Sequence, residues 1–345
     1  MKMNTLTLTH TSQHRYVAGL SASFFYLYFL FVAIHATGLY EEADEEIDES
    51  ERERKWDRFW FENIIMHVFF GMFVLCYTLS ITVSGHSPTD IMNLRRARER
   101  STGKREKYKN IWLRKPLTQL FTIEQKGSSD VKTVRFCKHC KTFKPDRTHH
   151  DSKLGKCVLK MDHYCPWLHN TLGHNNLKYF YLTLLYGSCS LLTWVILMTP
   201  RFGRSWSGME YMRRDFLILF GYFFAILLFG PVFWFFTFHT RLMLTAYTTI
   251  EFCELRDNQN KSTSKHYKSS PFDQGAYANT CEMLGPIPLL WLVPTRICMR
   301  EDGDMWFYAD DIDRCRVDMN HSLTKVKLKE IENVDVEKLL ERETK

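Results

Sequence analysis

Charged residues are absent from four long stretches of this 345-residue chain, each of 22 to 25 residues. A helix of that length crosses a hydrocarbon core of about 30 Å. Four such runs with charged flanks argue against apolar helices inside one soluble core. The first run also lacks an evident small-residue cleavage site of a secretory signal. The sequence therefore predicts an α-helical polytopic membrane protein with four retained spans, at residues 16–40, 63–85, 179–200 and 216–239.

Acidic residues are scarce in the loop between the second and third spans. Residues 86–178 hold 21 bases and eight acids, whereas residues 41–58 hold ten acids and four bases. Because basic loops stay in the cytoplasm, we expect the central loop and both termini to be cytoplasmic. Four arginines within residues 201–215 weakly oppose this orientation.

A sequence-reading nucleic-acid module is also lacking, although the net charge is +7, so we expect no nucleic-acid partner. The bases lie in a loop tethered between two spans, where they would face anionic lipid headgroups of the bilayer. The clearest case is residues 94–109. Three interpretations of this segment stay open: it binds lipid headgroups, it binds coenzyme phosphates, or it is only a solvated helix face.

These patterns divide the chain into four parts. Residues 1–85 carry the first two spans, and residues 86–178 form a cytoplasmic loop whose cysteine-rich part covers about 135–178. The third and fourth spans lie within residues 179–239, and residues 240–345 form a cytoplasmic tail. The far tail, residues 322–345, suits either a docking segment or a disordered end.

The ten cysteines do not resemble a disulfide framework, because four of them lie in the cytoplasmic loop, where thiols stay reduced. Cys137 and Cys140 form a Cys-x-x-Cys pair, and His150 and Cys157 can complete the four nitrogen and sulfur ligands that Zn²⁺ prefers. The loop has little apolar pattern with which to build a core. We therefore expect one structural zinc ion that supplies folding energy to this loop.

Alternatives to this zinc site follow from the same residues. His139 and His149 are neighbouring candidates for the nitrogen ligand. A redox role for the Cys-x-x-Cys pair would need a thioredoxin-like βαβ context, which the sequence lacks. A membrane-bound ubiquitin ligase of the RING type would need about eight ligands for two ions, and the loop has too few.

Cys165 lies outside this ligand set and is a candidate nucleophile. Free thiols ionise only near pH 8.5, but a neighbouring imidazole can accept the proton, and a carboxylate can orient that imidazole. Asp162 and His163 supply these groups, although short Asp-His pairs also occur by chance in solvated loops. Pro166 and Trp167, followed closely by the third span, would hold this segment at the bilayer surface, which suits chemistry on a lipid.

The cysteine-rich segment resembles that of the DHHC protein S-acyltransferases (palmitoyltransferases). The similarity rests on Cys137, Cys140, Lys144, Pro145, Arg147, His150, Cys157, Asp162, His163, Cys165, Pro166, Trp167, Asn170, Gly173 and Asn176. Beyond the last span, Thr248, Thr249 and Glu251 match the family's Thr-Thr-x-Glu motif, and Asn279, Gly285, Trp291 and Pro294 resemble its C-terminal motif. The resemblance covers most of residues 16–294.

Members of that family generally bind two zinc ions, and the second ligand set is replaced here. Its four positions carry Asp151, Leu154, Tyr164 and Thr171. Tyr164 turns the Asp-His-His-Cys signature into Asp-His-Tyr-Cys, and the resemblance identifies the missing histidine as a zinc ligand rather than the base. We expect one zinc ion, with polar contacts and packing in place of the second. The Asp-Pro-Gly motif after the second span is also degraded, at residues 84–88.

The resemblance implies a two-step transfer of a long-chain acyl group from palmitoyl-CoA, through Cys165, to cysteine thiols of membrane-associated proteins. His163 would act as general base and acid, Asp162 would orient it, and Thr249 would lie near Asp162. Trp167 and Asn279 are supporting residues by the same comparison, although Trp167 also suits an interfacial anchor. The alternative is a catalytically inactive membrane adaptor whose zinc-stabilised loop binds partners.

Overall fold

A computed structural model describes residues 3–85, 124–125, 132–133, 136–140, 142–144, 147–208, 212–260, 270 and 272–295. Two segments for which the sequence makes predictions, 94–109 and 322–345, lie outside these residues. The chain divides into two compact units. The first comprises Met1–Val83, Cys165–Asn170 and Lys178–Arg241, and the second comprises Ser84–Tyr164, Thr171–Leu177 and Leu242–Lys345.

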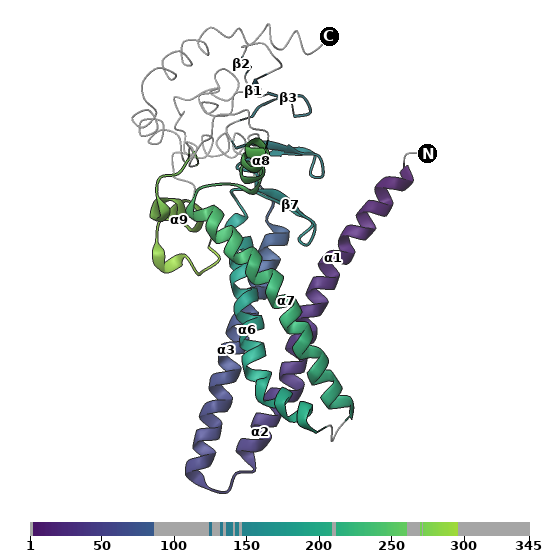
Figure 1. The fold of residues 1–345 in the computed structure, drawn as a ribbon, viewed down its shortest axis with the longest axis vertical. Helices are drawn as coiled ribbons and strands as arrows, with labels where there is room; N and C mark the ends of the chain where they lie inside the picture. The colour runs from purple at the N-terminus through teal and green to yellow at the C-terminus, as the bar shows by residue number, and fades with distance from the viewer. Residues whose placement is uncertain are drawn as a thin grey trace, which may run out of the picture. The chain divides into compact units, whose positions relative to one another are not determined.

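The first unit contains the long apolar helices (Figure 1). They are α1 (Met3–Leu30), a π-helical segment η1 (Phe31–Ala36), α2 (Thr37–Asp44), α3 (Glu49–Thr82), α6 (Leu177–Ser207) and α7 (Met212–Leu244). Four segments are long and apolar enough to cross a membrane: Val17–Asp44, Glu49–Thr82, Leu177–Ser207 and Arg213–Leu244. The four predicted spans are confirmed. Each helix starts before its charge-free run, and its outer turns carry polar and charged residues that water and headgroups can solvate. The second run was predicted to reach residue 85, but α3 ends at Thr82.

Aromatic rings and polar contacts join α1, α3 and α6. Phe24 of α1 stacks on Phe73 of α3 with ring centroids 4.1 Å apart. Gly187 of α6 faces these rings, and a Cβ there would lie 3.2 Å from Phe73. Trp194 of α6 donates from Nε1 to the backbone carbonyl of Leu27 at 2.7 Å. This bond satisfies a donor that would otherwise be costly to bury in an apolar bundle.

The second unit is built from short hairpins and short helices. Three antiparallel hairpins pair β1 (Glu124–Gln125) with β2 (Lys132–Thr133), β3 (Phe136–Cys137) with β4 (Thr142–Phe143), and β5 (His149–Asp151) with β6 (Lys156–Val158). Strands β7 (His163–Cys165) and β8 (Asn170–Leu172) form a further two-stranded sheet. The later elements are α8 (Thr249–Asn260), α9 (Ala276–Leu284) and the 3-10 turn η2 (Pro288–Leu290). The cysteine-rich segment thus lies between the second and third spans.

Two asparagines and a glycine of the resemblance shape the end of this segment. Asn170 donates from Nδ2 to the carbonyl of Ser80 at 2.9 Å and to two further carbonyls at the end of α3. It therefore caps carbonyls that lack intrahelical donors. Asn176 accepts from the Gly173 N–H at 2.9 Å. Only glycine fits at Gly173, because a Cβ would lie 2.8 Å from the Leu159 carbonyl oxygen.

Candidate active site and metal centre

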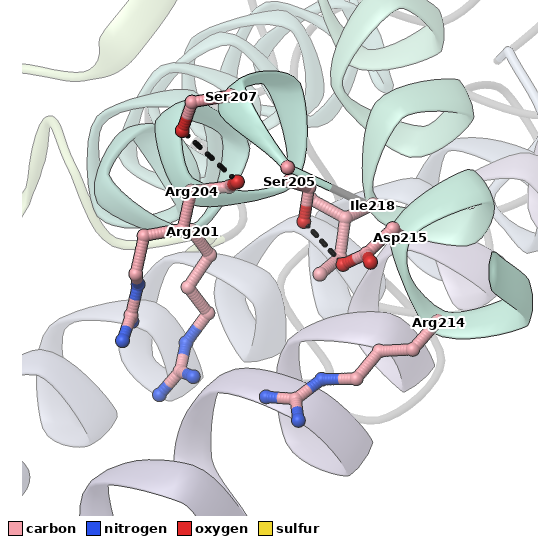
Figure 2. Close-up of a pocket in the computed structure, with 8 residues that line it drawn as sticks. Arg201, Arg204, Ser205, Ser207, Arg214, Asp215 and Ile218 are labelled. Atoms are coloured by element: carbon pink, nitrogen blue, oxygen red, sulfur yellow. Dashed lines mark hydrogen bonds between the residues drawn. The ribbon is translucent and has the colours of Figure 1, made fainter. Parts of the chain in front are cut away.

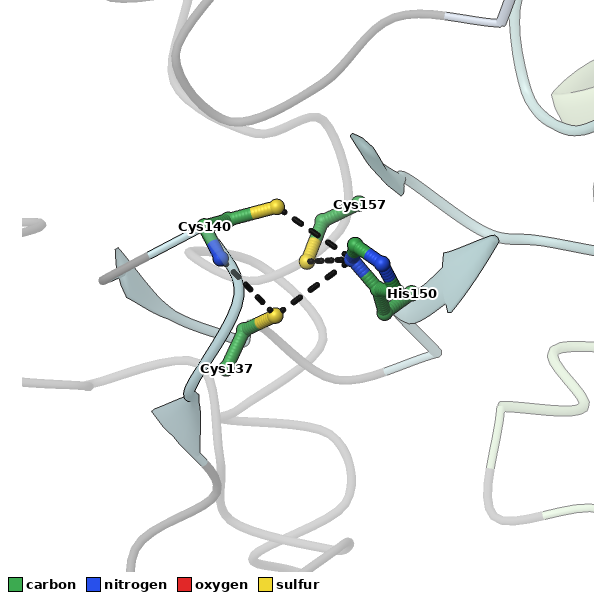
Figure 3. Close-up of side chains that lie close together, drawn as sticks. All are labelled: Cys137, Cys140, His150 and Cys157. Atoms are coloured by element: carbon green, nitrogen blue, oxygen red, sulfur yellow. Dashed lines mark hydrogen bonds between the residues drawn. The ribbon is translucent and has the colours of Figure 1, made fainter. Parts of the chain in front are cut away.

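Three thiols and one imidazole converge in the cysteine-rich segment (Figure 3). His150 Nδ1 lies 3.5 Å from Cys137 Sγ, 3.3 Å from Cys140 Sγ and 3.9 Å from Cys157 Sγ. All four candidate ligand atoms lie within 4.8 Å of one another. Zn–S bonds of about 2.3 Å and Zn–N bonds of about 2.0 Å place tetrahedral ligands roughly 3.5 to 3.8 Å apart. The cluster can therefore hold a metal ion of that kind.

Local hairpin geometry brings these four residues together. His150 in β5 is paired directly with Cys157 in β6. The turn after β3 brings Cys140 back to Cys137, whose sulfur accepts the Cys140 N–H at 3.3 Å. His139 stacks on the His150 ring, with centroids 4.8 Å apart, and it is not a member of the ligand cluster. Of the histidines left open by spacing, His150 is therefore the one placed to bind.

The chemistry of the donor set favours a bound cation. Burial raises the pKa of the Cys157 thiol. Burial acts in the same direction on Cys137, but hydrogen bonds, first that from the Cys140 N–H, outweigh it and lower the pKa of that thiol. A coordinated metal ion would favour the deprotonated form of every thiol bound to it. Three buried or half-buried sulfurs around one imidazole thus fit a site that is completed by a divalent metal ion.

Hydrogen bonding joins two of the four positions that differ from a second ligand set. Asp151 and Thr171 are both buried, and the Thr171 hydroxyl donates to the Asp151 carboxylate. The other oxygen of that carboxylate accepts the Lys153 N–H at 2.8 Å. Leu154 and Tyr164 are half-buried. A direct side-chain contact therefore joins β5 and β8.

Strand β7 carries His163 and Cys165, and Asp162 immediately precedes it. Alternate residues of a strand share a face, so β7 directs the imidazole and the thiol to the same side. Asp162 is 2% exposed and Cys165 is 5% exposed. His163 Nδ1 lies 2.7 Å from Asp162 Oδ2. An ionised carboxylate is only an acceptor, so Nδ1 carries the hydrogen and Nε2 keeps a lone pair that can accept a proton.

Two adjacent threonines at the start of α8 make different contacts. The Thr248 hydroxyl accepts the Glu251 N–H at 3.2 Å, while Glu251 Oε2 accepts the Thr248 N–H at 2.8 Å. This reciprocal pair is a capping box. Thr249 instead donates to Asp162, from its backbone N–H to Oδ1 and from its hydroxyl to Oδ2, both at 2.8 Å. The carboxylate therefore accepts three hydrogen bonds that fix its orientation.

A buried ion network holds α8 against the cysteine-rich segment. Arg147 is 3% exposed, and its Nε and Nη2 donate to the two oxygens of Glu251 at 2.8 Å each. Arg147 Nη2 also donates to the Ala246 carbonyl at 2.8 Å. Lys160, also buried, pairs with Glu282 of α9. Because Glu251 also completes the cap of α8, Arg147 anchors the helix that carries Thr249.

The two remaining supporting residues have scaffold contacts. Asn279 is buried in α9 and donates from Nδ2 to the Leu244 carbonyl at 2.8 Å and to Asp273 at 2.7 Å. These contacts tie α9 to the end of α7. Trp167 is half exposed, and its carbonyl accepts the Tyr77 hydroxyl at 3.1 Å. Both residues therefore contribute through position rather than through a reactive group.

Sequence reasoning did not identify Lys160 and Glu282 as partners. They are separated by 122 positions, and neither belongs to a motif with recognisable spacing. Most lysines are exposed, and nothing in the sequence marks Lys160 as a buried one. Arg147 belongs to the residues that carry the resemblance, but sequence spacing does not predict its pairing with Glu251, which is 104 positions away.

Comparison with known proteins places these residues in one family. Residues 130–256 match the family model described as DHHC palmitoyltransferase. Palmitoyltransferase ZDHHC15A of Danio rerio is 37% identical over 184 residues, which cover 51% of this chain and 53% of the relative. Palmitoyltransferase ZDHHC20 of Homo sapiens is 32% identical over 237 residues, covering 67% and 62% respectively.

A third relative aligns over a larger share of its own length. Palmitoyltransferase ZDHHC15 of Rattus norvegicus is 31% identical over 239 residues, which cover 67% of each chain. The chain thus spans between about half and two thirds of the length of these three relatives. With four spans, a Cys3His cluster and the motif residues in sequence order, this chain is an integral, multi-pass membrane protein that belongs to the DHHC palmitoyltransferase family.

Proposed function

We propose that this protein is a protein S-palmitoyltransferase that moves a long-chain acyl group from acyl-CoA to cysteine thiols of membrane-associated proteins. The observation that carries the proposal is the orientation of His163 by Asp162, whose carboxylate is itself held by Thr249. An imidazole fixed in this tautomer, two residues before a buried cysteine in one strand, is the arrangement that activates a thiol.

The first step forms an acyl-enzyme on Cys165. The thiol gives its proton to His163 Nε2, and the sulfur attacks the thioester carbonyl of acyl-CoA. The carbonyl carbon forms a bond to Cys165 Sγ as its bond to the coenzyme sulfur breaks, and His163 returns the proton to the leaving thiolate. Asp162 balances the charge on the imidazolium while it exists.

The second step repeats this chemistry with a protein thiol as the nucleophile. The acceptor gives its proton to His163, its sulfur takes the acyl group, and Cys165 leaves and recovers the proton. One thioester replaces another in each step, so the bonds formed and broken are of the same type and little driving force is required. Palmitoyl-CoA is the proposed donor, and the basic loop would face the coenzyme phosphates.

The cysteine-rich segment would bind one structural zinc ion through Cys137, Cys140, His150 and Cys157, with the Asp151–Thr171 contact in place of a second ion. That ion would stabilise the hairpins that carry the active-site strand. The proposed orientation puts this segment, the N-terminus and the tail from residue 240 on the cytoplasmic side, where acyl-CoA and its protein thiols are found.

A two-stage transfer tests this function. The purified protein is incubated with labelled palmitoyl-CoA, separated from free coenzyme, and then mixed with a cysteine-containing acceptor peptide. We expect label to leave the protein and appear on the peptide, whereas Cys165→Ala should yield neither labelled species. Cys253→Ala, which alters an exposed cysteine of α8, is the matched control and should transfer normally. A folded, metal-loaded protein that never acquires label would instead support the adaptor function.

A further inference from the structure

The joined ends of α6 and α7 form a cavity of about 370 Å³ that has no part in the chemistry proposed above (Figure 2). Its lining contains three arginines, one aspartate and two serines, with a glycine and an isoleucine. These residues are Arg201, Arg204, Arg214, Asp215, Ser205, Ser207, Gly208 and Ile218. All of these residues belong to the first unit. Its charged lining therefore carries an excess of positive charge.

Arg201 is buried at this cavity and is held by a relay of polar groups. Its Nε donates to His35 Nδ1 at 3.0 Å, and His35 Nε2 lies 2.5 Å from Glu62. Because Arg201 can only donate, His35 Nδ1 accepts and Nε2 carries the hydrogen given to Glu62. Gly38 of α2 leaves space for the guanidinium, since a Cβ there would lie 2.6 Å from Arg201 Nη2.

The rest of the lining combines a buried hydrogen-bonded pair with two exposed arginines. The Asp215 carboxylate accepts the Ser205 hydroxyl at 2.7 Å, and both of these side chains are buried. Arg204 and Arg214 are exposed. Arg201 also has an acidic neighbour outside the cavity lining, because its Nη2 lies 3.9 Å from Glu42 Oε1. Figure 2 shows the three guanidinium groups on the same side of the view, below the Ser205–Asp215 hydrogen bond. Like charges that converge on a cavity are stabilised by a shared anion.

The position of the cavity suggests which anion this is. At 1.5 Å per residue α6 is about 46 Å long, which exceeds a hydrocarbon core of about 30 Å. Its last turns therefore emerge into the headgroup region. Trp206, in the same turn of α6 as Arg204, is 67% exposed, as is usual for tryptophans at the membrane interface.

We propose that this cavity binds a phosphate group, supplied either by a phospholipid headgroup of the adjoining leaflet or by inorganic phosphate. The planar guanidinium groups of Arg204 and Arg214 bind phosphate oxygens with paired hydrogen bonds. Buried Arg201 adds positive charge at the inner wall. The proposal depends on the membrane-spanning fold and is independent of acyl transfer.

Binding measurements on the full-length protein in detergent test this site. The probes are a short-chain phosphatidic acid, the matching diacylglycerol without phosphate, and inorganic phosphate. The test variant is Arg204→Gln/Arg214→Gln, and the control is Arg213→Gln, which removes a neighbouring exposed arginine that does not line the cavity. Circular dichroism and thermal unfolding verify that each variant folds, and the two single substitutions replace the double variant should it unfold.

We expect phosphatidic acid to bind the wild type and the Arg213 variant equally, and to bind the double variant at least about tenfold more weakly, since two charge-assisted contacts are lost. Competition by inorganic phosphate at comparable concentrations would assign the site to the free ion, and the absence of competition would assign it to the lipid. Equal binding of diacylglycerol and phosphatidic acid, equal affinity in the double variant, or equal weakening by Arg213→Gln would each overturn the proposal.

Discussion

Replacement of Thr249 with valine tests the proposed Asp162–His163 pair with little change in shape. Valine removes the hydroxyl that donates to Asp162 Oδ2, the oxygen that also faces His163 Nδ1. The backbone N–H of residue 249 still donates to Oδ1. The carboxylate should therefore remain in place but be less firmly oriented, so that the effect falls on catalysis rather than on folding.

The magnitude follows from the lost contact. A hydrogen bond to a charged group contributes about 1.5 to 3 kcal/mol, and each 1.36 kcal/mol is about tenfold in rate. If this energy orients the imidazole during thiol attack, Thr249→Val should slow acylation of Cys165 by about 10- to 100-fold. Single-turnover acylation with labelled palmitoyl-CoA, at fixed pH and saturating donor, measures this rate directly.

Two variants serve as controls for the measurement. Thr249→Ser retains the hydroxyl and should remain near the wild-type rate. Thr248→Val removes the acceptor of the helix cap, so it should lower the free energy of unfolding by about 1 kcal/mol while acylation stays nearly unchanged. If Thr249→Val were folded and acylated at the wild-type rate, the hydroxyl contact would have no role in orienting the pair.

Further predictions concern stability and metal content. Arg147→Met should cost about 3 to 5 kcal/mol of unfolding free energy, because it leaves the partly buried Glu251 without its cationic partner; thermal unfolding measures the loss, and a Tm within error of the wild type would contradict it. Asp151→Ala should lower stability by about 1.5 to 3 kcal/mol without altering zinc content, as judged by calorimetry and metal analysis together. Metal analysis of the wild type should return about one zinc per chain, whereas a reproducible value near two would refute the loss of the second site. Tyr164→Ala should mainly reduce stability; complete loss of acylation in a protein with unchanged Tm would give the tyrosine a chemical role.

The membrane spans were predictable because the signal is local. An uncharged run of sufficient length identifies a span regardless of its neighbours, and each of the four runs coincides with an apolar helix, although the second run extends three residues past the end of α3 at Thr82. The ends of these helices were less predictable. The charged residues of the outer turns belong to the helices. The first turn of α3 contains Glu49 and Glu51, and Asp48 caps it by accepting the Glu51 N–H at 3.0 Å. A search for uncharged runs leaves such turns out.

The candidate metal ligands were predictable for a similar reason. The Cys-x-x-Cys pair and the β-hairpin that pairs His150 with Cys157 lie within about twenty residues of the sequence. Spacing alone left His139 and His149 as alternatives. His139 lies in the turn after β3, and the choice between the adjacent His149 and His150 depends on strand register. Register is set by pairing with β6, which sequence spacing does not specify.

The sequence did not predict which buried side chains pair with one another, because these pairs join segments that are distant in the chain. Arg147 and Glu251 are brought together by the fold of the second unit, as are Asp151 and Thr171. The resemblance suggested that polar contacts and packing replace a second metal site, but it did not specify which residues bond. A buried ion pair or hydrogen bond needs two complementary side chains that are buried to a similar extent. The extent of burial is set by the folded protein.

The most direct test of the central claim is to locate the acyl group on the protein. After a brief incubation with palmitoyl-CoA, peptide mapping by mass spectrometry should find one hydroxylamine-sensitive acyl group, on Cys165, and His163→Ala should acquire it much more slowly. An acyl group found only on another cysteine, such as Cys253, or equally rapid acylation of Cys165 without the imidazole, would contradict the proposed mechanism.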